Sequence, residues 1–168
     1  MTGVQTCALP IFVVPRGAKL MMLPQRPYFP LATLEAAVSY PAEPDAFGSA
    51  RIAEVLGAVG MPALAQRPTE EAHWNRMLSL GEQQRLGIAR AILHAPDYLF
   101  LDEATASLDE ASEAKLYRLL QERLPCATIV SIGHRSTLMA FHDRHLALLP
   151  DGDRHRVREV VFEGSVNG

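Results

Sequence analysis

Short apolar runs alternate with longer segments of helical periodicity through most of the chain. The apolar runs that predict strands span residues 19–23, 98–101, 128–132, 145–149 and 157–162. Their short length and β-branched content are typical of buried strands. The last two flank Asp151-Gly152, which predicts a hairpin turn. Strands that alternate with a helical segment at residues 110–124 predict an α/β fold with a largely parallel sheet.

The residues between the first two predicted strands have helical rather than strand periodicity. Residues 33–40 predict a helix capped by Thr33, and residues 49–59 repeat apolar side chains at i, i+3, i+4 and i+7 before Gly60 ends the helix. Residues 61–77 are predicted to be irregular. We expect Trp74, the single tryptophan, to be a packing residue.

A third helical segment begins with a recognisable cap. Ser79 followed three residues later by Glu82, before an apolar periodic run, fits a capping box. A helix N-terminus presents unpaired N–H groups that can bind an anion, and Gly81 would let a phosphate approach the backbone closely. An ordinary capped helix without a ligand explains the same residues, so this segment alone does not decide the function.

Two adjacent acids, Asp102 and Glu103, follow the apolar run at residues 98–101. Open α/β sheets bind their ligands at the carboxyl ends of the strands. Burial of two carboxylates without a cation is costly, and a magnesium ion at Asp102 with a water at Glu103 would remove that cost. The alternative is that both acids are solvated at the start of a loop.

Composition narrows the possible classes of protein. The 168 residues are enough for one domain with a core, and the net charge of −3 gives no indication of a nucleic-acid-binding patch. The two cysteines give neither a disulfide framework nor metal-ligand spacing. No run approaches the roughly 18 apolar residues of a membrane span. Residues 1–11 look like the translation of a sequencing adapter, so we expect the functional domain to be 12–168 and exclude 1–11 from functional reasoning.

Five segments in a fixed order give the chain a specific resemblance. They are the loop containing Gln25, the stretch Leu78-Ser79-Leu80-Gly81-Glu82, the acids Asp102 and Glu103, the turn ending in Asp109, and Gly133-His134-Arg135. From about residue 19 onward, this order resembles the Q-loop, signature, Walker B, D-loop and H-loop of an ATP-binding cassette (ABC) ATPase. The resemblance implies a P-loop NTPase-like cassette that lacks its N-terminal part and has a helical subdomain at about residues 31–93.

The resemblance also implies a role for each matching residue. Asp102 and Gln25 would hold Mg²⁺, Glu103 would polarise the attacking water, and His134 would stabilise the γ-phosphate of ATP. Ser79, Gly81 and Glu82 would face ATP bound to a second subunit, and Asp109 would couple the two sites. The chemistry would be phosphoryl transfer to water, in which positioning and charge stabilisation dominate.

The chain departs from the family pattern in two places. Leu80 stands where most cassettes have glycine, and together with Trp74 it is similar to subfamily D-like half-transporters, which include peroxisomal fatty-acyl exporters and bacterial peptide or cobalamin importer-like proteins. No Gly-x-x-x-x-Gly-Lys-Ser/Thr phosphate-binding loop occurs in the sequence. We therefore expect an N-terminally truncated cassette that binds ATP poorly on its own and does not hydrolyse it.

The function predicted from this resemblance is that of the C-terminal portion of a transporter's ATPase domain. Its expected partners are a transmembrane domain, fused upstream in the parent protein, and a second cassette in a head-to-tail dimer, most simply a homodimer, without nucleic acid. The expected location is the cytoplasmic face of a bacterial inner membrane. One alternative is a soluble ABC ATPase of DNA repair or translation. Another is a non-catalytic fragment, against which Glu103 and His134 argue.

Overall fold

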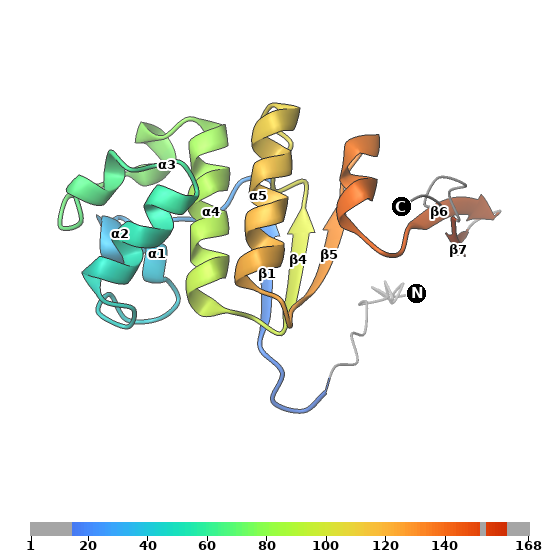
Figure 1. The fold of residues 1–168 in the computed structure, drawn as a ribbon, viewed down its shortest axis with the longest axis horizontal. Helices are drawn as coiled ribbons and strands as arrows, with labels where there is room; N and C mark the ends of the chain where they lie inside the picture. Colours follow the sequence, from blue (N-terminus) through green and yellow to red (C-terminus); the bar gives the residue numbers. More distant parts are fainter. Residues whose placement is uncertain (1–14, 152–153, 161–168) are drawn as a thin grey trace, which may run out of the picture.

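The computed structural model describes residues 15–151 and 154–160. Within them, a parallel sheet is formed by β1 (Leu20–Pro24), β4 (Tyr98–Asp102) and β5 (Thr128–Ile132), in the order β1-β4-β5. The helices α4 (Leu80–His94) and α5 (Glu110–Arg123) lie across one face of this sheet (Figure 1). The predicted α/β architecture with a parallel sheet is confirmed. Residues 1–11, which resemble a translated adapter, lie outside the described residues.

A cluster of short elements connects β1 to α4. It contains α1 (Leu34–Ser39), α2 (Ser49–Ala58), α3 (Trp74–Met77), the 3₁₀ turn η1 (Leu64–Gln66), and the antiparallel pair β2 (Ala32–Thr33) and β3 (Glu71–Ala72). Figure 1 shows these helices grouped on the far side of α4 from α5. Residues 61–77, predicted to be irregular, therefore include η1, β3 and α3. These elements are too short to leave a periodic signal, which explains the wrong prediction.

The core is densest around α4 and the middle strand. Leu99 and Leu101 of β4 are buried beneath the helices, together with Leu86 of α4 and Leu116 of α5. Helix α4 is buried on more than one face, because α1, α2 and α3 pack on it opposite the sheet. Trp74 is fully buried and its indole N–H donates to the carbonyl of Ala32 at 2.9 Å, so its predicted packing role is confirmed.

The second face of the sheet is largely exposed. Ile132 is 60% exposed, and Met22 of β1 and Val130 of β5 are also exposed. The prediction of a buried strand at 128–132 was therefore wrong for β5. Its β-branched residues form the strand, but β5 is an edge strand of the described sheet and helices cover only one of its faces.

The C-terminal hairpin pairs β6 (Leu146–Asp151) with β7 (Arg154–Glu159), after the 3₁₀ turn η2 (Ser136–Phe141). The predicted hairpin is confirmed, but its second strand begins earlier than residue 157 because Asp151 pairs with Arg154. Residues 161 and 162 lie outside the described part. His142, which follows η2, is half-buried and bonds to the Ser131 hydroxyl at 2.8 Å. None of the described helices combines the length and apolar character that crossing a bilayer requires.

Candidate functional site

The register of the sheet brings the predicted strand-end residues to one edge. Pro24 is paired with Asp102, and Asp102 is paired with Ile132. Gln25 and Glu103 therefore follow directly after matched strand ends, and His134 follows two residues after the third. All the strands are parallel, so these residues share the carboxyl edge of the sheet.

Glu103 and His134 are in direct contact at this edge. The His134 Nε2 lies 2.7 Å from the Glu103 carboxylate. The Glu103 side chain is only 28% exposed, whereas that of His134 is 87% exposed. The pair therefore joins a half-buried carboxylate, which can polarise a water, to an imidazole that is accessible to a ligand.

The backbone of Glu103 has an uncommon conformation. Its φ is +51°, in the left-handed region that residues other than glycine rarely adopt. Two main-chain hydrogen bonds hold it there: the Glu103 N–H donates to the Ile132 carbonyl at 3.0 Å, and the Glu103 carbonyl accepts from the Ala106 N–H at 3.1 Å. Such conformations occur at functional sites when the surroundings over-determine them.

Asp102 and Gln25 remain the candidate magnesium ligands. Asp102 is half-buried at the end of β4 and Gln25 is exposed beyond β1. Across the described residues, no group of three or more His, Cys, Asp or Glu side chains has a geometry suited to a metal. Mg²⁺ commonly takes one or two protein ligands and completes its shell with water and substrate phosphates, so the Asp102 carboxylate fits a magnesium nucleotide better than a bare ion.

The predicted capping box at the start of α4 is present. The Ser79 hydroxyl accepts from the Glu82 N–H at 3.4 Å, and the Glu82 carboxylate accepts from the Ser79 N–H at 2.8 Å and from its hydroxyl at 2.7 Å. The hydrogen bonds from the Ser79 hydroxyl and then its backbone hold the pKa of Glu82 below its ordinary value. Ser79 and Glu82 are both exposed, so a fixed helix start faces outward.

Gly81 packs closely against the turn that precedes α5. A Cβ added at Gly81 would lie 3.2 Å from Leu108 Cδ2 and 3.5 Å from the Ser107 carbonyl. The glycine predicted to admit a phosphate therefore also admits the turn at residues 104–108. These distances show that α4 and this turn are in close contact.

Asp109 is the N-cap of α5, and its Oδ1 accepts from the Ser112 N–H at 2.9 Å. The hydrogen bonds from Ser112, the backbone one first, lower the pKa of Asp109. This local role was not predicted, and it orients the carboxylate on the outside of the molecule.

Sequence reasoning missed Arg135, the residue after His134. Its guanidinium donates to the carbonyls of Leu108 at 2.7 Å and Ala106 at 3.1 Å, and it pairs with the buried Glu113 at 3.4 Å. Arg135 therefore fastens the loop of His134 to the turn before Asp109. The sequence signal that could have identified Arg135 was its position directly after a candidate site histidine.

Gln84 was also missed. It is 2% exposed and shares a face of α4 with Ile88 and Ala91, at i+4 and i+7. An amide at such a position has to satisfy its hydrogen bonds inside the protein, and this was the signal that could have found it.

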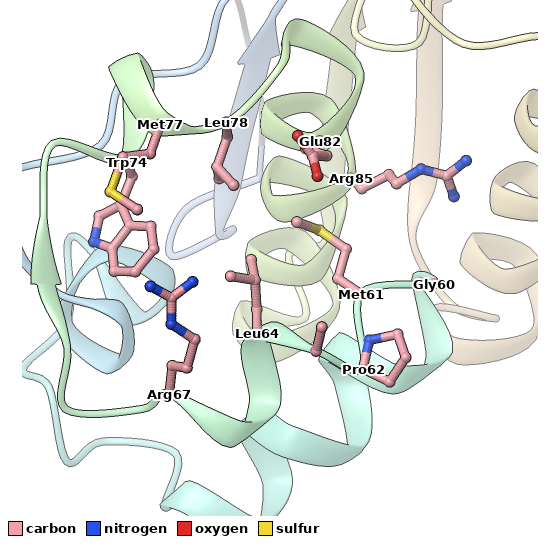
Figure 2. A pocket seen from close by; sticks show the side chains of 11 residues that line it. Gly60, Met61, Pro62, Leu64, Arg67, Trp74, Met77, Leu78, Glu82 and Arg85 are labelled. Atoms are coloured by element: carbon pink, nitrogen blue, oxygen red, sulfur yellow. The ribbon is translucent and has the colours of Figure 1, made fainter.

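A cavity of about 490 Å³ lies away from the strand ends, between η1, α3 and α4. Figure 2 shows the side chains that line it, among them Trp74, Leu64, Leu78, Arg67 and Glu82. Its position among the helices beside the α4 cap separates it from the edge that carries Glu103 and His134.

Comparison with known proteins finds similarity to one family. The family model described as ABC transporter matches residues 15–106. An uncharacterized ABC transporter ATP-binding protein of Haemophilus influenzae is 48% identical over 132 residues, which are 79% of this chain and 22% of that protein. The human lysosomal cobalamin transporter ABCD4 is 38% identical over 144 residues, covering 79% of this chain and 23% of that protein.

A solved structure gives the same result for the fold. A bacterial Atm1-family ABC exporter with ATP bound superposes with a TM-score of 0.66 at 26% identity, over 76% of this chain and 23% of that one. The chain thus spans about a fifth to a quarter of the length of each of these proteins.

Proposed function

This chain belongs to the ABC transporter family, and from that premise we propose that it is part of the ATP-hydrolysing cassette that couples ATP binding and hydrolysis to transport across a membrane. The observation that carries the proposal is the shared sheet edge, where Glu103 and His134 lie 2.7 Å apart beside Asp102 and Gln25. The transporter names of the relatives favour transport over a soluble ABC ATPase.

Each residue at the edge has a proposed task. The Glu103 carboxylate orients and polarises the attacking water, and His134 donates a hydrogen bond towards the γ-phosphate. Asp102, with Gln25, holds the magnesium ion. When bound, Mg²⁺ would neutralise charge on the β- and γ-phosphates. The half-buried position of Glu103 supports this assignment, because partial exclusion of water strengthens its interaction with a positioned water.

A second cassette is proposed to meet the outward-facing start of α4. Ser79, Gly81 and Glu82 would approach ATP held by that subunit, and Asp109 would lie across the same interface. The exposure of Ser79, Glu82 and Asp109 supports this placement. We propose a homodimer, each subunit fused to a transmembrane domain, at the cytoplasmic face of a bacterial inner membrane.

The phosphate-binding loop is proposed to lie in a part of the parent protein outside these 168 residues. Without it, Asp102, Glu103 and His134 have no clamp for the triphosphate. We therefore expect residues 12–168, purified alone, to show no steady ATP turnover, while the full-length protein in lipid nanodiscs hydrolyses ATP. Turnover by residues 12–168 at the rate of the full-length protein would contradict the missing-loop proposal, and its absence from the full-length protein would contradict the ATPase proposal.

A further inference from the structure

One buried side chain contacts three of the segments that surround the proposed catalytic edge. The Gln84 Nε2 donates to the Gln25 carbonyl at 3.0 Å and to the Glu103 carbonyl at 3.4 Å, and its Oε1 accepts from the Ser107 N–H at 3.0 Å. We propose that Gln84 is a positioning residue that fixes the Glu103 carboxylate relative to the Gln25 loop and the turn containing Ser107. This inference rests on the proposed ATPase function.

The contacts of Gln84 use both ends of its amide. Two of its partners are carbonyls, which accept, and the third is an N–H, which donates, so the partners fix the orientation of the amide. The Gln84 side chain is only 2% exposed, so water cannot readily take the place of a lost hydrogen-bond partner. Losing a partner is therefore costly. A residue of different shape or hydrogen-bonding capacity would therefore disturb all three segments.

Glu103 is the proposed base among the residues that Gln84 contacts. Its left-handed backbone, with φ of +51°, is held from β5 through the Ile132 carbonyl and from its own turn through the Ala106 N–H. Gln84 of α4 adds a third hydrogen bond, to the Glu103 carbonyl. Because the backbone angles limit which rotamers a side chain can adopt, these hydrogen bonds restrict the directions open to the carboxylate, which lies 2.7 Å from His134.

Helix α4 thereby links two proposed nucleotide contacts. At its start, Ser79 and Glu82 are exposed and face the proposed partner subunit. The following turn carries Gln84, which holds Glu103 within the same subunit. Gly81 also packs against Leu108 and Ser107, so α4 holds the turn containing Ser107 at two points. A displacement of α4 would therefore reach Glu103 directly.

The neighbouring Gln83 provides a matched control. It is also buried, at 8% exposure, and also uses its whole amide: its Nε2 donates to the carbonyls of Asn75 at 3.1 Å and Leu78 at 2.8 Å, and its Oε1 accepts from Asn75 at 3.0 Å. No bond in this set goes to Glu103 or Ser107. The two residues therefore share type, helix, burial and hydrogen-bond number and differ in what they hold.

The test replaces each glutamine by methionine, which is similar in length and makes no strong hydrogen bond, in the full-length protein in nanodiscs. For Gln84→Met we expect kcat to fall by about 10²-fold with KM for ATP within about twofold, because a misplaced catalytic group affects the transition state more than binding. For Gln83→Met we expect a similar drop in melting temperature with a fall in kcat of under about threefold. Equal falls in kcat for the two variants would overturn the proposal.

Amide hydrogen exchange of the peptide containing Ser107 gives a second readout that does not require turnover. We expect faster exchange in Gln84→Met than in wild type or Gln83→Met. If wild type hydrolyses no ATP, the proposed function fails. Unchanged Ser107 exchange in Gln84→Met overturns the positioning role whether or not wild type hydrolyses ATP.

Discussion

The molecule has two parts that are packed very differently. In the helix-packed part, β4 and α1–α5, the side chains of Leu86, Ile88 and Leu99 are fully buried. In the open part, β5, η2, β6 and β7, Ile132 is 60% and Leu148 is 70% exposed. Glu103 comes from the packed part and His134 from the open part. The proposed site therefore lies where the densely packed part meets the more exposed part. Substitutions in the two parts should have different effects on stability.

The largest expected effect is at the junction itself. Glu103→Gln keeps the size of the side chain and its place beside His134 but removes the base, so kcat of the full-length protein should fall by about 10²- to 10⁴-fold. ATP-dependent dimerisation, measured by size-exclusion chromatography with light scattering, should persist. Glu110→Gln, at an exposed position in the first turn of α5, is the control. A near-normal rate for Glu103→Gln would reject Glu103 as the base.

The contrast in packing predicts the next largest effect. Trp74→Ala removes a fully buried side chain and its bond to the Ala32 carbonyl, so the free energy of unfolding should fall by about 3–5 kcal/mol. Leu148→Ala, at a 70% exposed position of β6, should change it by less than about 0.5 kcal/mol. Both changes in unfolding free energy can be measured by urea unfolding monitored by far-UV circular dichroism, a signal that does not require the tryptophan. Equal losses would remove the distinction between the two parts.

A smaller effect is expected at the start of α4. Ser79→Ala removes the side-chain cap while leaving the body of the helix packed, so the cost should be about 1 kcal/mol of unfolding free energy. The control is Ser136→Ala, at the exposed start of η2, where no side-chain cap bond is made. If Ser79→Ala costs no more than the control, packing alone defines the start of α4 and the cap is incidental.

The smallest expected effect depends on pH. The pKa of Glu82 is lowered from 4.5 in the folded protein, so its ionised form contributes stability above that pH, and the contribution is lost as pH falls through the folded pKa. At pH 7, Glu82→Gln should be less stable than wild type by roughly 0.3–1 kcal/mol. The difference should shrink when urea unfolding is repeated below 4.5. A constant difference would show that the charge of Glu82 does not contribute.

Local signals were enough to predict the parts of the site set by short-range chemistry. Ser79 and Glu82 lie three residues apart, so their capping box can be read directly. Asp102 directly follows a short apolar run, which is enough to predict that it stands at the carboxyl end of a strand. These predictions needed no knowledge of distant contacts.

The remaining features depend on contacts between segments far apart in sequence. Gln84 reaches Gln25 across 59 residues, and no periodicity marks that contact. The residues of β5 favour a strand whether or not helices cover both faces of the sheet. The sequence therefore did not indicate that Ile132 is exposed. Residues 61–77 fold into short elements through Trp74 and its contact with Ala32, a tertiary effect that overrides their polar composition.

The left-handed backbone at Glu103 has a consequence for engineering this protein. Such a conformation costs a residue with a side chain about 1–3 kcal/mol, and glycine adopts it freely. Replacement by glycine would therefore relieve strain while deleting the proposed base. A screen that ranks variants by thermal resistance alone would favour an inert cassette, so thermostabilisation of this protein needs an assay that retains the carboxylate.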